Sequence, residues 1–335
     1  MGSSRREVFV AMGSRPRRAG RTLPGVDDRH VRGPAAPGTF GTRGGAGEGG
    51  RIRGVNVRRR PVPARDRAAC RVEPFPRAQH QMVDWLGLMH RQHTVHALLE
   101  VDVTDARRAI REHRTRTGEG LSFTAFVVAN LARAVDEDRR MHAYRRGRDQ
   151  LVLFDDVDVT VLVETDVEGA KIPFPHIVRA ANRKTLDQVH AEIRAAQAAG
   201  PPYVAGRRWL PLWLLVPGFL RQRIWAMVLA DPRRRKRLTG TVAVTSVGMF
   251  GRGTAWAIPL TGYSLCLTVG SIARKPGVVV GTTEEARGGR RAERIEVREM
   301  LALTVSVDHD VIDGAPAARF GARLARLLED GAGLD

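Results

Sequence analysis

Strand-like and helix-like segments follow one another in this chain without a strict strand–helix–strand rhythm, and this irregular order most constrains the fold. Segments rich in β-branched residues, with partial alternation of apolar and polar positions, predict strands over residues 93–104, 151–164, 241–251, 263–272 and 301–307. Apolar positions at helical spacing predict helices over residues 105–114, 121–135, 183–200 and 315–330. We therefore predict an α/β (α+β) fold in which helices flank a mixed β-sheet.

The first fifth of the chain differs from the rest in composition. Residues 1–70 contain 16 arginines and five acidic residues, so they carry a net charge of +11 out of +19 for the whole chain. They are rich in glycine and proline and have too few apolar residues to offset the entropy cost of ordering. We predict a disordered arm over residues 1–70 and one folded domain over residues 71–330. Only Phe9 and Phe40 lie among the arginines as aromatic residues, so we favour a solvated tail over a nucleic-acid-binding arm.

Several common functional classes lack their sequence signals. The two cysteines, Cys70 and Cys266, have neither metal-site nor disulfide spacing, so we expect no metal site. The arginine pair in SRREVF is not followed by an apolar export segment, and we expect a cytoplasmic protein. No glycine-rich phosphate loop follows a predicted strand, which argues against a nucleotide-binding enzyme.

The segment over residues 209–237 requires a membrane test. It begins with twelve largely apolar residues, but Arg221 and Arg223 then interrupt it. A spanning helix needs about 20 consecutive apolar residues, so we expect no membrane-spanning segment and no membrane partner. We favour a buried helix or a contact between subunits, and an interfacial amphipathic helix is the alternative.

A polar corner, VSVDHDVIDGAPAARF, joins the last predicted strand to the last helix. His309 directly follows the strand, and imidazole is the side chain best suited to proton transfer near neutral pH. Asp313 could cap the helix, orient a neighbouring group or pair with an arginine. Because the chain has neither a G-x-S-x-G serine elbow nor a cysteine beside a histidine, a base here would activate an external nucleophile. The spacing alone favours a hydrogen-bonded surface histidine.

A second candidate is VTSVGMFG, in which Thr245 and Ser246 end a strand just before Gly248. A hydroxyl fixed at this place could donate to a developing oxyanion. The alternative is a turn in which the hydroxyl bonds to its own backbone, and the residues alone favour that interpretation.

These two motifs occur in order with EVDVTDARRAI, LSFTAFVVANLARAV, VDVTVLVETD, AANRKTLDQV and SLCLTVGSIARKP. Together they resemble the catalytic domain of the acyltransferase (E2) components of 2-oxoacid dehydrogenase complexes, a family that shares its fold with chloramphenicol acetyltransferase. The resemblance spans about Val72–Leu328. It implies a homotrimer, or a multiple of trimers, with active sites between subunits. It also implies coenzyme A as a substrate.

The resemblance assigns roles to three residues. His309 matches the general base that takes a proton from the thiol of CoA or dihydrolipoamide. Thr245 matches the hydroxyl that stabilises the oxyanion from the neighbouring subunit, and Asp313 matches a position that supports the site geometry. Asp310 stands where the family usually has arginine, so a nearby anion is expected to raise the proton affinity of His309 if the two groups are close.

We therefore predict a stand-alone CoA-dependent acyltransferase that uses a thiol acceptor such as dihydrolipoamide. No lipoyl-bearing lysine is expected on this chain, so a lipoyl-carrying protein would be its partner. Two alternatives stay open at this point: a chloramphenicol-type O-acetyltransferase that acts on a small molecule, and a catalytically inactive trimeric scaffold.

Overall fold

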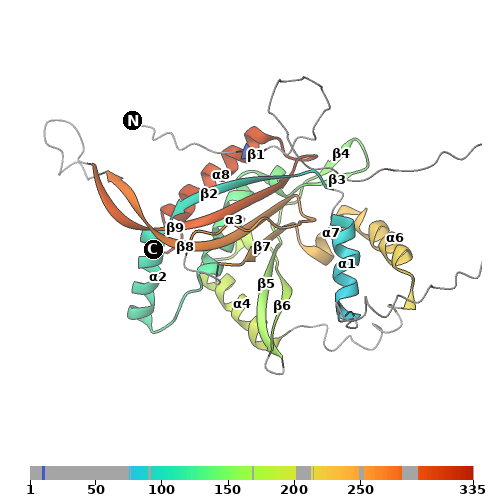
Figure 1. Ribbon diagram of the computed structural model, residues 1–335, viewed down its shortest axis with the longest axis horizontal. Helices are drawn as coiled ribbons and strands as arrows, with labels where there is room; N and C mark the ends of the chain where they lie inside the picture. Colours follow the sequence, from blue (N-terminus) through green and yellow to red (C-terminus); the bar gives the residue numbers. More distant parts are fainter. Residues whose placement is uncertain are drawn as a thin grey trace, which may run out of the picture. The chain divides into compact units, whose positions relative to one another are not determined.

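The computed structural model describes residues 10–11, 75, 77–89, 92–167, 170–200, 213, 215–248, 253–280 and 293–334. Within these residues a seven-stranded sheet has the order β1-β2-β9-β8-β7-β5-β6 (Figure 1). The strands are Val10–Ala11 (β1), Thr94–Asp102 (β2), Val159–Val167 (β5), Ala170–Val178 (β6), Val242–Ser246 (β7), Leu265–Val280 (β8) and Glu293–Asp308 (β9). Strand β7 is parallel to both β5 and β8, and the other neighbours are antiparallel. The predicted mixed sheet is confirmed.

Helices flank this sheet. They are Arg77–Met89 (α1), Thr104–Thr117 (α2), Phe123–Glu137 (α3), Leu186–Ala199 (α4), Gly218–Leu229 (α6), Pro232–Thr239 (α7) and Gly314–Glu329 (α8). Helices α3, α4 and α8 cover the apolar face of the sheet, and the other helices lie at its sides. Helix α3 packs against both α4 and α8, while α8 contacts β2 and α4 contacts β5. Ser122 caps α3, since its hydroxyl accepts a hydrogen bond from the Ala125 N–H. The core therefore lies between the sheet and these helices.

The alternation of side chains along β9 explains how one sheet can have two different faces. Leu301, Leu303 and Val305 join the buried apolar core together with residues of α3 and α8. Thr304 and Ser306, which lie between them in sequence, are also buried but point to the opposite face. That opposite face is lined by small polar residues, and the candidate site residue Thr245 belongs to it.

Strands β8 and β9 form a hairpin much longer than predicted. The expected strands covered residues 263–272 and 301–307, whereas each observed strand has 16 residues. The outer half of the hairpin carries charged side chains that cross to neighbouring elements, such as Arg298 to Asp102 at 2.7 Å. The prediction did not include this half, although Ile295 and Val297 alternate with charged residues along β9.

Helices α1, α6 and α7 gather at one side of the sheet, and α6 lies on their outer side (Figure 1). A buried ion pair joins α1 to α6, because Arg221 Nε donates to Asp84 Oδ2 at 2.6 Å. The expectation of a buried helix over residues 209–237 is not met by α6. Its Phe219 and Met227 side chains are 76% and 66% exposed. The face that carries Arg221 packs against α1, and the face that carries Phe219 and Met227 stays exposed.

A helix long and apolar enough to cross a membrane is not found among the described residues. The boundary at residue 70 stays a prediction, because only Val10–Ala11 of the proposed arm lies within the described ranges.

Candidate active site

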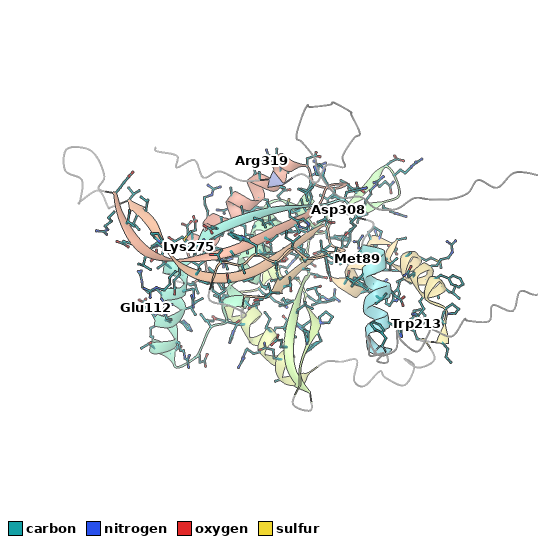
Figure 2. All side chains as sticks on the ribbon, in the orientation of Figure 1. Met89, Glu112, Trp213, Lys275, Asp308 and Arg319 are labelled. Atoms are coloured by element: carbon teal, nitrogen blue, oxygen red, sulfur yellow. The ribbon has the colours of Figure 1, made fainter. Side chains whose placement is uncertain are left out.

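The turn after β9 holds the predicted corner, and Asp308 organises it (Figure 2). The Asp308 carbonyl accepts hydrogen bonds from the backbone N–H groups of Val311 and Ile312 at 3.0 and 2.9 Å. Its carboxylate accepts from the Asp310 N–H at 3.1 Å and from the Gln92 side chain at 3.2 Å. Burial raises the pKa of this carboxyl group. Asp308 therefore fixes the backbone that presents the next residue.

His309 lies in this turn with a partly buried side chain. Its backbone N–H donates to the carbonyl of His93 at 2.8 Å, which ties the turn to the beginning of β2. Its ring has no hydrogen-bond partner among the described residues. A histidine whose backbone is fixed while its ring nitrogens stay available is suited to exchange a proton with a ligand.

Asp310, the residue that replaces the family arginine, contacts two other side chains. Its Oδ1 lies 3.0 Å from His93 Nδ1, and its Oδ2 lies 3.6 Å from Arg145 Nη1. Both carboxylate oxygens therefore already face a hydrogen-bond or ion-pair partner. Sequence analysis missed His93 and Arg145, since both are far from the corner in sequence. The pairing of β2 with β9 brings His93 to it.

Asp313 occupies the N-cap position of α8, in extended backbone conformation. Its carbonyl accepts from the Ala317 N–H at 3.1 Å, but its side chain makes no capping hydrogen bond. The exposed carboxylate is thus available to a group outside the described chain. The helix that begins here buries Phe320, Leu324 and Leu328 against the core, which anchors the corner from its other end.

Thr245 lies near the end of β7 and is partly buried, while the neighbouring Ser246 is exposed. In the sheet register Thr245 pairs with Thr268 of β8, which pairs with Thr304 of β9. The hydroxyls of Thr268 and Thr304 are buried and have no hydrogen-bond partner within the described residues. Thr245 is therefore the outermost member of a row of three hydroxyls on the polar face of the sheet.

One chain does not bring Thr245 and His309 together. Thr245 is level with Thr304 in the register, and His309 follows Thr304 by five residues along β9. Extended chain rises about 3.3 Å per residue, so the two residues are separated by roughly 16 Å along the strands. A donor must lie about 3 Å from the oxyanion that it stabilises. The two groups of one chain cannot act on the same carbonyl.

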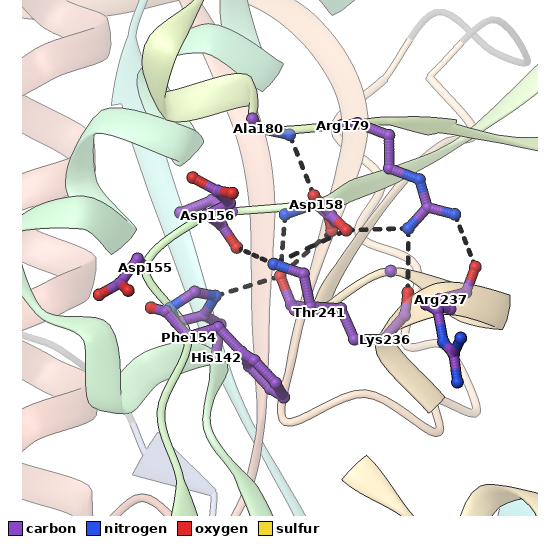
Figure 3. Close-up of polar contacts among 12 residues, drawn as sticks. His142, Phe154, Asp155, Asp156, Asp158, Arg179, Ala180, Lys236, Arg237 and Thr241 are labelled. Atoms are coloured by element: carbon purple, nitrogen blue, oxygen red, sulfur yellow. Dashed lines mark hydrogen bonds and ion pairs between the residues drawn. The ribbon is translucent and has the colours of Figure 1, made fainter. Parts of the chain in front are cut away.

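A second polar cluster surrounds the start of β7 and is shown in Figure 3. Buried Asp158 accepts from the Ala180 N–H at 3.0 Å and from Arg179 Nη1 at 2.8 Å. The Arg179 guanidinium also donates to the last carbonyls of α7, at Lys236 and Arg237. The backbone N–H of Thr241 donates to the Asp158 carbonyl at 2.7 Å. This cluster locks α7, β5 and β7 together.

His142 completes that cluster and is fully buried. Its Nε2 lies 3.0 Å from the Phe154 carbonyl, which can only accept, so Nε2 carries the proton. Its Nδ1 then accepts from the Thr241 hydroxyl at 3.1 Å. Burial lowers the pKa of His142 to about 4, so this ring is neutral at physiological pH. Both nitrogens are used within the protein.

Other reactive groups do not form a site in the described part of the chain. No group of three or more potential metal ligands occurs there. The buried thiol of Cys266 has its pKa raised to about 11 by desolvation, so it is not an activated nucleophile. Cys70 lies outside the described residues.

Comparison with known proteins identifies related sequences and folds. Residues 234–334 match the family model described as the 2-oxoacid dehydrogenases acyltransferase catalytic domain. The lipoamide acyltransferase component of the branched-chain alpha-keto acid dehydrogenase complex of Bacillus subtilis is 25% identical over 236 residues, which are 69% of this chain and 46% of that protein. The family resemblance predicted from the motifs is confirmed. The chain spans about half the length of this relative or less.

Solved structures share the fold. The cubic core of the pyruvate dehydrogenase multienzyme complex is 20% identical, with 82% of this chain and 99% of that chain covered and a TM-score of 0.54. The dihydrolipoamide acetyltransferase of Azotobacter vinelandii, studied for the role of a serine, a histidine and an asparagine in its catalytic mechanism, is also 20% identical. The match covers 82% of this chain and 99% of that chain, with a TM-score of 0.53.

Proposed function

Because this chain carries the catalytic-domain signature of the 2-oxoacid dehydrogenase acyltransferases at residues 234–334, we propose that it is a CoA-dependent acyltransferase. The acyl group would pass between CoA and a thiol acceptor such as dihydrolipoamide on a partner protein. The observation that carries the proposal is that Thr245, His309 and Asp313 all lie inside the matched segment. The polar ends of β7 and β9 supply the two groups that thioester exchange needs.

His309 acts as the general base in this mechanism. A thiol with a pKa near 8.5 is mostly protonated at neutral pH, and imidazole has a pKa near 6.5 in water. The ring takes the thiol proton as the sulfur attacks the thioester carbonyl, so the nucleophile becomes a thiolate only during attack. The available ring nitrogens of His309 support this role.

Thr245 donates to the oxygen on which negative charge develops. When the thiolate adds to the carbonyl, a tetrahedral intermediate forms, and a fixed hydroxyl donor stabilises its oxyanion. Collapse of the intermediate breaks the original carbon–sulfur bond. The departing thiolate takes back the proton that His309 holds, so no acyl-enzyme is formed and the base is regenerated.

The active site is formed by two subunits of a homotrimer in this proposal. Its support is the separation of roughly 16 Å, along the strands, between Thr245 and His309 of one chain. Threefold symmetry lets His309 of one subunit meet Thr245 of the next and repeats the site at each interface. Asp313, with its free carboxylate beside the same corner, orients groups at that interface.

The direct test is a panel of acyl-CoAs assayed against thiol, hydroxyl and amine acceptors. We expect thiol acceptors, including a lipoylated protein domain, to give the highest kcat/KM. A preference for a hydroxyl acceptor would instead assign O-acyl transfer, and no transfer to any acceptor would favour an inactive scaffold.

Mixing two inactive variants tests whether subunits share the site. His309→Ala and Thr245→Ala chains would be co-expressed, so that random mixed trimers contain both. If the site is shared, about one quarter of the interfaces combine an intact histidine with an intact threonine, and activity returns to that level. If one chain supplied both groups, no mixed interface would be complete, and the mixture would stay inactive.

A further inference from the structure

Helix α6 presents an apolar outer face. Phe219, Leu220, Arg223 and Met227 fall within an arc of about 100° at 100° per residue, and all four side chains are exposed. The opposite face holds Arg221, whose ion pair with Asp84 is buried against α1. The outer face therefore has no packing role that the described part of the chain accounts for.

Arginines frame this apolar face. Arg223 lies within it, and Arg233 and Arg237 are exposed on the neighbouring helix α7. None of the three forms an ion pair with an acidic side chain among the described residues. Asp231, the acidic residue at the start of α7, already contacts Arg234 at 3.5 Å. The surface thus combines protruding apolar side chains with uncompensated positive charge.

The two features are joined by one hollow of about 540 Å³. Met227 and Ala230 of α6 line it together with Arg146, Arg233 and Arg234. Asp231 also lines the hollow and lies 3.5 Å from Arg234. An anionic group placed there would therefore face the guanidinium groups of Arg146 and Arg233, while an attached apolar chain could lie along Met227. This pairing matches the chemistry of an anionic lipid.

We propose that the outer face of α6 and the exposed arginines of α7 form a docking surface for an anionic membrane. Phe219 and Met227 would enter the boundary between headgroups and acyl chains, and the arginines would contact lipid phosphates. The protein would lie on the bilayer without crossing it.

Charge and shape favour this occupant. Two copies of the same face would bring arginines against arginines, which disfavours a symmetric contact between copies. An acidic protein could meet the arginines. However, Phe219 and Met227 are strongly exposed apolar side chains, so a protein would have to supply a matching pocket for them. The boundary between lipid headgroups and acyl chains accepts such side chains without a preformed pocket.

The experiment is co-sedimentation of the full chain with vesicles, one set of phosphatidylcholine and one with about one third phosphatidylglycerol. We expect binding to the anionic vesicles only. The double variant Phe219→Ser, Met227→Ser leaves the net charge unchanged and should lower the partition coefficient at least about tenfold. Arg233→Glu, Arg237→Glu should cause a similar loss.

Matched controls come from other exposed positions. Ile295→Ser, Val297→Ser removes two exposed apolar side chains of β9, and Arg319→Glu reverses one exposed charge of α8. Both controls should bind anionic vesicles nearly as the unaltered chain does, and all variants should keep their melting temperature. Unchanged binding by the Phe219, Met227 variant would overturn the proposal, since the arginine-rich N-terminal segment would then account for binding.

Three further outcomes would also overturn it. Equal binding to neutral vesicles would remove the role of charge. Displacement from vesicles by free CoA would assign the arginine-lined hollow to the phosphates of that substrate. A smaller particle mass for the Phe219, Met227 variant in solution would assign the face to a second copy of the chain.

Discussion

Two histidines of this molecule show opposite uses of the same side chain. His142 is fully buried, both of its ring nitrogens are hydrogen-bonded, and its pKa is lowered to about 4. His309 is partly buried, and only its backbone is held. Both hydrogen-bonding positions of the first histidine are used within the protein, which stabilises the fold. The second is positioned by the protein and left with bonding capacity for a ligand.

The contrast extends to the surroundings of each histidine. Around His142, Asp158 and Thr241 satisfy one another in a closed network that joins α7 to the sheet. Close to His309, Asp313 keeps an exposed carboxylate. The row that ends at Thr245, roughly 16 Å away along the strands, contains two buried hydroxyls without partners in the described chain. Both parts of the proposed site, which one chain keeps apart, thus retain polar groups that have no partner in the described residues.

The largest effect is expected from His309→Ala. Removing a general base costs about 10²–10⁴-fold in rate, so acyl transfer should fall by that factor in kcat/KM. The melting temperature should not change, because the ring makes no hydrogen bond within the described residues. A steady-state assay and a thermal melt on the same sample check both parts, and unchanged turnover would contradict the general-base role.

Thr245→Ala should have the next largest effect. Loss of one oxyanion donor lowers kcat by about 10²–10³-fold and leaves KM nearly unchanged, since the interaction forms only in the transition state. Ser246→Ala is the matched control from the adjacent position. If Ser246→Ala gives the loss and Thr245→Ala does not, the neighbouring hydroxyl is the donor.

The buried histidine predicts a pH-dependent stability. The unfolded chain protonates His142 near pH 6.5, but the folded chain resists protonation until about pH 4. The stabilisation is therefore fully present above pH 6.5 and is lost as the pH falls toward 4, by up to about 3 kcal/mol. Urea unfolding at several pH values measures this slope. Glutamine cannot titrate, so the unfolding free energy of His142→Gln should change less with pH over the same range. An equal slope in both proteins would show that other groups cause the pH dependence.

The smallest effect is expected from Asp310→Asn. This change weakens the contacts of Asp310 with His93 and Arg145, which are largely exposed, so unfolding should become easier by at most about 1 kcal/mol. Chemical denaturation provides the measurement. A much larger loss of stability would mean that Asp310 supports the corner as strongly as Asp308 does. The surroundings of His309 would then resemble the hydrogen-bonded network around His142.

The sequence predicted the elements whose burial is periodic. Helix α3 begins within two residues of the expected residue 121, and the strand followed by His309 was placed within a residue or two of its observed end. The outer part of β8 and β9 was missed although Ile295 and Val297 alternate with charged residues, because these apolar side chains are exposed and belong to no buried face. Local sequence patterns indicate buried faces and helix caps. They do not indicate which strands pair where neither face is buried.

The site was predictable only in part for the same reason. His309, Asp313 and Thr245 lie in short local motifs, and resemblance to a family gave them roles. The contacts of His93 with Asp310 and of Gln92 with Asp308 depend on the pairing of β2 with β9, two strands separated by about two hundred residues. A single sequence contains no local signal for that register.

The long β8–β9 pair sets rules for changing the length of this chain. One irregularity between Val269 and Ile272 separates an inner half, level with Thr245 and leading to His309, from the outer half. Residues added between Val280 and Glu293, beyond the last paired residues, would leave the inner half in phase. A single residue added to β8 between Leu265 and Ile272 would shift the register by one. Thr268 would then point to the opposite face of the sheet, out of its row with Thr245 and Thr304. Grafting peptides or tags should therefore succeed at the far end of the hairpin and abolish turnover near the irregularity.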